Sequence, residues 1–177
     1  MERKLFLKKV WDHTQSLILA FVLSMVIKAT VVEAFVVPTG SMEPTIAIGD
    51  RFFSNKLVYR FRTPKEGEIV IFTPPNKATP NGSIPFVKRV IAVEGDWVEI
   101  KDGLVYVNHQ PIKENYVKEH PLYQLNPLQV PHNTLFVLGD NRNNSYDSHV
   151  WGFVPLQNIK AKAMFRFWPV SRIGFVS

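Results

Sequence analysis

Three short segments of the sequence carry hydroxyl, amine and carboxyl side chains whose spacing could support nucleophilic catalysis. In the first, P-T-G-S-M-E-P at Pro38–Pro44, Ser41 follows a glycine and lies between two prolines, each three residues away. Proline fixes φ and glycine permits unusual φ values, so the segment can hold a hydroxyl in a reproducible position. A turn serine without a catalytic role fits the same residues. As a nucleophile, Ser41 would need a base to remove its proton.

A lysine in an apolar strand is one candidate for this base. In F-V-K-R-V-I-A-V, strand alternation places Lys88 on one face with three apolar residues, Phe86, Val90 and Ala92. Burial there would lower the pKa of Lys88, because desolvation disfavours the ammonium form. Arg89 falls on the opposite face and cannot deprotonate. A lysine that reaches water from a strand edge fits the pattern as well, so burial is permitted but not required.

A histidine is the other candidate. The sequence has five, at positions His13, His109, His120, His132 and His149. Only His149 lies near another polar cluster, two residues after Asp147. A triad of Ser41, His149 and Asp147 is conceivable. In an extended chain, however, an aspartate two residues before a histidine is poorly placed to orient the ring.

The third segment, G-D-N-R-N-N-S-Y-D-S at Gly139–Ser148, is dense in turn-forming polar residues. It is typical of a solvated loop or a structural turn. Its functional interpretation is a hydrogen-bonded scaffold, in which a hydroxyl and a carboxylate hold the base in position.

The elements that must position these segments are expected to be β-strands. After Val37, short apolar or alternating runs recur between Gly, Pro, Asn and Asp residues. Residues 101–103 predict a hairpin connection. Residues 73–85 and 113–132 are expected to form long surface loops, and residues 113–132 are expected to include a small strand or turn. No long amphipathic helix is expected beyond residue 40, and the 13 prolines fit a mostly β domain. The predicted strands are Glu68–Phe72, Phe86–Val93, Trp97–Ile100, Leu104–Val107, Thr134–Leu138 and Ala161–Trp168.

The N-terminal residues have the pattern of a segment that meets a membrane. Four basic residues precede the uncharged run Thr14–Ile27, in which Leu17–Ile27 is almost wholly apolar. A full membrane span needs about 20 residues, so this apolar run alone is too short. The helix could still cross if the long side chain of Lys28, at its outer end, reached the membrane interface. Composition leaves two alternatives open: a cleaved signal peptide, or an uncleaved anchor with its basic end inside.

The bulk properties narrow the class of protein. The 177 residues suffice for one compact domain plus an extra segment, and 46% hydrophobic with 20% charged residues argues against disorder. The chain lacks cysteine, which excludes disulfides and a thiolate nucleophile. A net charge of +6 suits an anionic membrane surface or nucleic acid. Because the basic residues are scattered and no groove-reading module is present, no nucleic acid partner is expected.

Taken in order, these segments resemble the type I signal peptidases, the Ser-Lys membrane proteases that release exported proteins. The resemblance covers most of the chain and rests on E-A-F-V-V-P-T-G-S-M-E-P-T, I-G-D-R-F-F-S-N-K, K-R-V-I-A-V-E-G-D, G-D-N-R-N-N-S-Y-D-S, W-G-F-V-P and F-R-F-W-P. It implies a mostly β fold, with an antiparallel β-sheet catalytic domain after one N-terminal transmembrane helix. The implied regions are a cytoplasmic basic tail (1–13), a membrane anchor (14–34) and an extracytoplasmic peptidase domain (35–177), in a cell or thylakoid membrane.

The resemblance also assigns roles to single residues. Ser41 corresponds to the nucleophile and Lys88 to its general base. Thr39 matches a hydroxyl that helps the Ser41 backbone N–H form the oxyanion hole. Ser145 matches a serine that hydrogen-bonds the lysine, and Asp147 matches an acid that braces the site. No cofactor or metal is implied, and the expected partners are preprotein signal peptides and the lipid membrane. The implied substrates are cleaved after small residues, at sites of the A-x-A type. The residues implied to bind them are Phe35, Val37, Pro38, Met42, Phe86 and Val87.

The sequence departs from the family pattern at His149, where many members carry an arginine that pairs with the acid. The motif N-N-S-Y-D-S-H resembles that of the cyanobacterial and chloroplast-thylakoid branch. A histidine at position 149 would make the support of the site by Asp147 sensitive to pH. The short span between Lys88 and Ser145 implies that the large accessory domain of some members is absent or reduced. The uncleaved anchor is favoured, because cleavage would untether the enzyme from its membrane-embedded substrate.

Two other functions remain as alternatives. A self-cleaving repressor also uses a Ser-Lys pair on a similar β fold, but it would need an N-terminal DNA-binding helical domain where this chain has an anchor-like segment. A non-catalytic, membrane-tethered β module is the alternative from a different class. The presence of Ser41, Lys88 and Ser145 together speaks against it.

Overall fold

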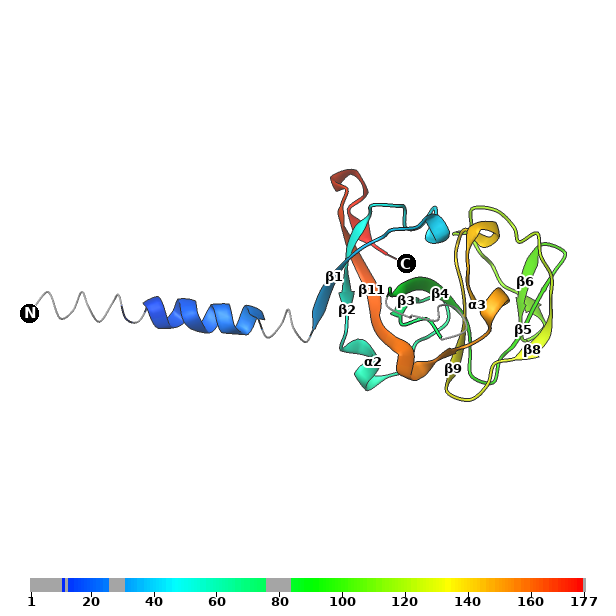
Figure 1. Ribbon diagram of the computed structural model, residues 1–177, viewed down its shortest axis with the longest axis horizontal. Coiled ribbons are helices and arrows are strands. Elements are labelled where there is room, and N and C mark those ends of the chain that lie inside the picture. The colour runs from blue at the N-terminus through cyan, green and yellow to red at the C-terminus, as the bar shows by residue number, and fades with distance from the viewer. Residues whose placement is uncertain (1–10, 12, 26–30, 76–83, 177) are drawn as a thin grey trace, which may run out of the picture.

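The computed structural model describes residues 11, 13–25, 31–75 and 84–176 (Figure 1). Residues 13–25 form an apolar helix whose side chains are exposed. Within the described residues, no helix is both long enough and apolar enough to cross a membrane. The expected basic tail lies almost wholly outside the described residues, as do residues 26–30 of the expected anchor.

Most strands of the described chain belong to one antiparallel sheet of eight strands, in the order β1-β2-β11-β3-β4-β9-β10, with β12 paired to β11. Strand β3 is buried at all four positions, as expected for a strand between two neighbours in a sheet covered on both faces. The bounds are β1 Val32–Val36, β2 Arg51–Asn55, β3 Ile69–Phe72, β4 Phe86–Val93, β9 Thr134–Leu138, β10 Val154–Pro155, β11 Ile159–Trp168 and β12 Gly174–Phe175.

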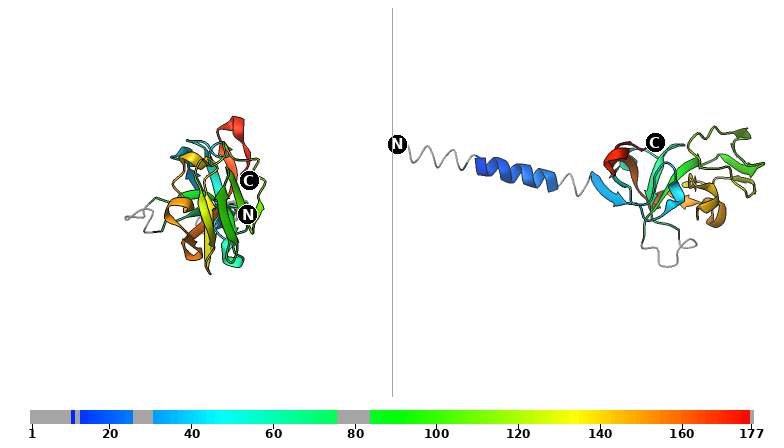
Figure 2. Two further views of the ribbon diagram at one scale, coloured as in Figure 1. Left: turned by 90° about the vertical axis from the view of Figure 1, so that its right-hand side faces the viewer. Right: turned by 90° about the horizontal axis from the view of Figure 1, so that it is seen from above.

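A second antiparallel sheet, in the order β7-β6-β5-β8, comes from the chain between β4 and β9. It lies at the end of the domain away from β1 (Figures 1 and 2). The predicted hairpin is confirmed: Asp102 and Gly103 join β5 to β6 with φ of 52° and 75°, the positive values that such tight connections require. The bounds are β5 Trp97–Lys101, β6 Leu104–Val107, β7 Gln110–Pro111 and β8 Leu125–Gln129.

The helices described beyond residue 40 have three or four residues each, in agreement with the sequence. Two of them, η1 and η2, begin the segments that carry the candidate catalytic hydroxyls. The bounds are η1 Gly40–Met42, α2 Val58–Phe61, η2 Arg142–Asn144, α3 Ser148–Trp151, η3 Leu156–Asn158 and η4 Val170–Arg172.

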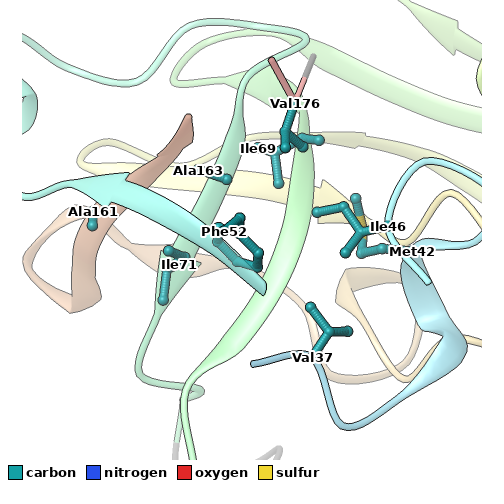
Figure 3. Close-up of a cluster of buried hydrophobic side chains, with 9 residues drawn as sticks. All are labelled: Val37, Met42, Ile46, Phe52, Ile69, Ile71, Ala161, Ala163 and Val176. Carbon is teal, nitrogen blue, oxygen red and sulfur yellow. The ribbon is translucent and has the colours of Figure 1, made fainter. Parts of the chain in front are cut away.

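One hydrophobic cluster packs directly beneath the Ser41 segment (Figure 3). Met42 and Ile46, on either side of the Glu43-Pro44-Thr45 turn, are fully buried in it against Phe52 of β2 and Ile69 of β3. Burial of two side chains of this size contributes about 1.5–3 kcal/mol each. The turn that carries Ser41 is therefore held down by the core.

A second cluster joins β4 and β9 to the second sheet. It contains Ile91, Phe136 and Leu138 from the large sheet and Val98, Ile100, Val105 and Val107 from β5 and β6. The two sheets thus share this cluster, and the chain between β4 and β9 has a fixed position against these two strands.

All six predicted strands are present, and β8 occupies the segment in which a small strand was expected. Strands β2, β7, β10 and β12 were not predicted. Residues Val32–Ala34, assigned to the anchor from sequence, belong to β1 and pair with β2. Strict alternation along β4 fails after Val90, where the pairing with β9 shifts register. Ala92 consequently packs in the same cluster as Ile91 rather than on the Lys88 face.

Candidate active site

Ser41 lies in the first turn after β1, and hydrogen bonds from a distant segment hold its backbone. The Asn141 side chain donates to the Gly40 carbonyl at 3.0 Å across 101 sequence positions. The Asn141 N–H donates to the Ser41 carbonyl at 3.1 Å. With Met42 buried beneath it, the turn is fixed from two sides, and the Ser41 side chain faces a pocket.

Lys88 reaches Ser41 from the centre of the large sheet. Its Nζ donates to the Ser41 Oγ at 2.5 Å, and its side chain is 4% exposed. Burial lowers the pKa of Lys88 from 10.5 to about 8, while the carboxylates of Asp147 and Asp140 act in the opposite direction. The structure brings together the serine and the lysine that the sequence singled out, 47 positions apart.

Thr39 lies beside the same hydroxyl. Its Oγ1 is 3.5 Å from the Ser41 Oγ. The backbone N–H of Ser41 lies in the first turn of η1, where N–H groups have no acceptor within the helix. Two donors, one from the side chain of Thr39 and one from the backbone of Ser41, therefore adjoin the position where a substrate carbonyl would meet the Ser41 Oγ.

Gly139 brings the third segment into contact with the first. A Cβ added to Gly139 would lie 2.2 Å from the Ser145 Oγ and 2.4 Å from the Ser41 carbonyl oxygen. Both distances are far below van der Waals contact, so a residue without a side chain is required here. Ser145 lines the same pocket as Lys88, but its Oγ is buried and has no hydrogen-bond partner among the described residues. The hydrogen bond from Ser145 to Lys88 that the family resemblance implies is therefore not formed in this structure.

Asp147 is buried and its two carboxylate oxygens have different partners. Oδ2 accepts a hydrogen bond from the Gly139 N–H at 2.9 Å. Oδ1 is 2.7 Å from the Nδ1 of His149 and caps the short helix α3. The imidazole of His149 therefore contacts Asp147, whereas the hydroxyl of Ser41 has Lys88 and Thr39 as partners. This geometry favours lysine over histidine as the base.

One part of the site was not expected from sequence. Arg89 is 3% exposed and forms a bidentate ion pair with the fully buried Asp140, with distances of 2.9 and 2.8 Å. The hydroxyl of Thr45 donates to the same carboxylate at 2.5 Å. The pair joins β4 to the segments of Ser41 and Ser145. Consecutive charged residues in a strand covered on both faces are a signal that a buried carboxylate partner is needed.

The pocket in front of Ser41 has a volume of about 510 Å³. Five of the six residues expected to bind substrate line it; Phe35 does not, and stacks instead on Phe52 in the core, with ring centroids 6.0 Å apart. Ile84, Pro85, Asn143, Asn144 and Tyr146 line it too, and were not predicted. The lining consists of these residues and Val37, Pro38, Thr39, Gly40, Ser41, Met42, Phe86, Val87, Lys88 and Ser145.

The chemistry that this arrangement can perform is acyl transfer. A hydroxyl next to a buried amine can be deprotonated and can attack a carbonyl carbon, and the adjacent donors can stabilise the resulting oxyanion. In the part of the chain that the structure describes, no three His, Asp or Glu side chains gather in a way that could hold a metal ion.

A family model and proteins of known family both match most of this chain. A family model described as "Signal peptidase, peptidase S26" matches residues 10–168. "Probable signal peptidase I-2" of Synechocystis is 44% identical over 164 residues, covering 92% of this chain and 75% of that protein. "Probable thylakoidal processing peptidase 2, chloroplastic" of Arabidopsis thaliana is 41% identical over 158 residues, 88% of this chain and 43% of that protein. Among solved structures, a signal peptidase I from Enterococcus faecalis V583 covers 57% of this chain and 97% of its own, with 27% identity and a TM-score of 0.49.

Proposed function

Because the chain belongs to the signal peptidase family, peptidase S26, we propose that it cleaves signal peptides from exported preproteins with Ser41 as nucleophile and Lys88 as general base. Family membership makes it a serine hydrolase of the signal peptidase I type, and the similar proteins of Synechocystis and Arabidopsis assign it to the cyanobacterial and chloroplast branch. The catalytic residues, the cleavage-site preference and the membrane tether are the parts that we propose.

The observation that carries the proposal is the 2.5 Å contact between the Lys88 Nζ and the Ser41 Oγ in a buried setting. A lysine acts as a base only in its neutral form, and burial lowers the pKa of Lys88 to about 8. Arginine could not serve, because a guanidinium stays protonated. The contact therefore joins a nucleophile to a base that is partly neutral near physiological pH.

In the proposed reaction, neutral Lys88 takes the Ser41 proton while the Ser41 Oγ bonds to the carbonyl carbon of the scissile peptide. The Ser41 N–H and the Thr39 hydroxyl stabilise the oxyanion that forms. When the C–N bond breaks, the Lys88 ammonium gives its proton to the leaving amine of the mature protein. Water then attacks the acyl-enzyme carbonyl while Lys88 takes a proton from it. As the bond from the carbonyl carbon to the Ser41 Oγ breaks, Lys88 returns this proton to the Ser41 Oγ, and the signal peptide leaves with a carboxyl group at its C-terminus.

Ser145 and Asp147 are proposed to support Lys88 rather than to react. Ser145 lines the pocket beside Lys88 and presents a hydroxyl that is not otherwise engaged among the described residues. Such a neutral partner can orient an amine without raising its charge. Asp147 holds the turn through the Gly139 N–H, with His149 on its other oxygen.

The substrate is proposed to be an extended peptide with small residues at alternate positions, as in an A-x-A site. The lining of the pocket supports this, because Val37, Met42 and Val87 offer apolar walls next to Ser41. An extended peptide can bind alongside a strand through main-chain hydrogen bonds, with alternate side chains entering shallow pockets.

We also propose that the chain is tethered to a cell or thylakoid membrane by an anchor that precedes β1, within the residues 14–34 expected from sequence, with the peptidase domain on the outer or lumenal face. The helix at residues 13–25 supports this, because its apolar side chains are exposed, among them Leu17, Leu19 and Phe21. Four basic residues precede it, which favours a cytoplasmic N-terminus. A tether raises the local concentration of enzyme around a membrane-embedded substrate.

The test is cleavage by the detergent-solubilised protein of a preprotein with an A-x-A site, followed by sequencing of the new N-terminus. Ser41→Ala is expected to abolish cleavage and to leave circular dichroism unchanged, because a single surface hydroxyl adds little stability. A Ser41→Ala protein of near-normal activity would refute the proposal. Cleavage at another position would refute the A-x-A preference alone.

A further inference from the structure

The segment between β7 and β8, residues 112–124, packs against the residues around the candidate site. Glu114 forms a bidentate ion pair with Arg142, a fully buried side chain whose Nε also donates to the Gly139 carbonyl. Tyr116 lies against Arg89, whose guanidinium carbon is 3.8 Å from the ring centroid. This segment, expected from sequence to be a surface loop, thus contacts Arg89, the neighbour of Lys88 in β4, and Arg142 in the segment that carries Ser145.

Tyr123, near the end of this segment, makes the contact closest to the brace of Lys88. Its ring stacks on His149, with centroids 3.9 Å apart and planes inclined by 14°. Its hydroxyl is buried and has no hydrogen-bond partner among the described residues. The contribution of Tyr123 to the site therefore lies in its ring and in the position that the ring imposes on the imidazole.

We propose that Tyr123 is a positioning residue, which acts on Lys88 by holding the imidazole of His149 on the carboxylate of Asp147. The inference rests on the proposed role of Lys88 as the base. A ring stacked flat on the imidazole opposes rotation about the Cβ–Cγ bond of His149, because that rotation would drive an edge of the imidazole into the Tyr123 ring. In the stacked position the His149 Nδ1 lies 2.7 Å from the Asp147 Oδ1, so the stack preserves the hydrogen bond and keeps water from the buried carboxylate.

The effect on Lys88 follows from the charges around it. Asp147 and Asp140 both favour the ammonium form of Lys88, and each has a partner that reduces its influence. Arg89 pairs with Asp140. For Asp147 the partners are the Gly139 N–H and His149.

Loss of the ring of Tyr123 would free the imidazole, strengthen the field of Asp147 at Lys88 and admit water. The charged groups that face Tyr123 itself are Asp147, Arg142 and Glu114. Their carboxylates and guanidinium are held by other partners, so His149 is the group that responds. Both the stronger field and the added hydration raise the pKa of Lys88.

The test measures kcat/KM against pH for the detergent-solubilised full chain and three variants. In Tyr123→Leu, the pH of half-maximal kcat/KM is expected to rise by about 0.5–1 unit, so that the rate at pH 7 falls about three- to tenfold while the rate near pH 10 changes less. Tyr123→Phe keeps the ring and should retain the profile of the parent protein. Leu122→Ala, which changes an exposed neighbouring side chain, should retain it too.

An unshifted profile in a folded Tyr123→Leu protein would overturn the inference, as would the same fractional loss at every pH, which indicates a merely structural role. A shift in Tyr123→Phe would also overturn it, because the hydroxyl would then be the active part. If Tyr123→Leu fails to fold, His149→Phe decides: it keeps a ring against Tyr123 and removes the bond to Asp147, and an unshifted profile refutes the inference. In each of these cases, an inactive Lys88→Arg leaves the proposed function intact.

Discussion

The pH dependence of cleavage tests whether Lys88 is the base, and its size follows from the burial of the side chain. With the usual pKa of 10.5, about one lysine in 3,000 is neutral at pH 7; with a pKa of about 8, the neutral share is about one in ten. Burial therefore raises the reactive population about 300-fold at neutral pH. The cost of deprotonation at pH 7 falls from about 5 to about 1.4 kcal/mol.

The direction of the effect is fixed by the form that reacts. If neutral Lys88 accepts the proton of Ser41, as proposed, activity must rise as the pH passes upward through the pKa of Lys88. For a pKa of about 8, the initial rate should increase about fivefold between pH 7 and 8 and less than twofold between pH 8 and 9. Initial rates on a preprotein substrate, at fixed ionic strength and with folding checked by circular dichroism, give this profile.

Three variants separate lysine from histidine as the base. Lys88→Arg should be as inactive as Lys88→Ala, since a guanidinium cannot accept the proton. His149→Ala should retain substantial activity, reduced about ten- to a hundredfold by the loss of bracing. An active Lys88→Arg protein, or a rate that does not change between pH 7 and 9, would remove lysine from the mechanism. An inactive His149→Ala beside an active Lys88→Arg would establish the histidine triad instead.

Two further outcomes are expected. Gly139→Ala should lower kcat/KM about a hundredfold. The new Cβ would lie 2.4 Å from the Ser41 carbonyl oxygen and would displace Ser41 by a fraction of an ångström or more. Near-normal kcat/KM in this variant would mean that the turn can shift without disturbing the position of the Ser41 hydroxyl. In intact membranes, protease added to the outer or lumenal face should digest residues 35–177, and protection of that domain would reverse the proposed orientation.

The sequence predicted the strands well where one residue type alternated with another or where an apolar run was bounded by turn residues. It did not predict β2, because burial alternates along R-F-F-S-N while hydrophobicity does not: Phe53 is exposed and Ser54 is buried. The bulge in β4 could not be foreseen either, since a register shift is set by the partner strand β9. These failures share a cause: the information lies in the neighbouring strands and not in the segment itself.

The proximity of Ser41, Lys88 and Ser145 was anticipated through the family resemblance, whereas their local sequences left turn and strand-edge alternatives open. The ion pair between Arg89 and Asp140 was missed, although a buried arginine beside Lys88 needs a carboxylate, because 51 positions separate the two residues. Tyr123 lacks any sequence signal of this kind. Its stack on His149 depends on how the second sheet returns residues 112–124 to the first.

The place of β11 in the large sheet has a consequence for biosynthesis. This strand follows every other long strand in the described chain, yet it lies between β2 and β3 and pairs with both. The turn that carries Ser41 lies between β1 and β2. This pair of strands is therefore joined to the half of the sheet that carries Lys88 through residues 159–168. A nascent chain that has not yet emerged to this point cannot close the sheet around Ser41. The Ser41 turn and Lys88 can therefore reach their final geometry only after residues 159–168 have been synthesised and have paired with both halves of the sheet.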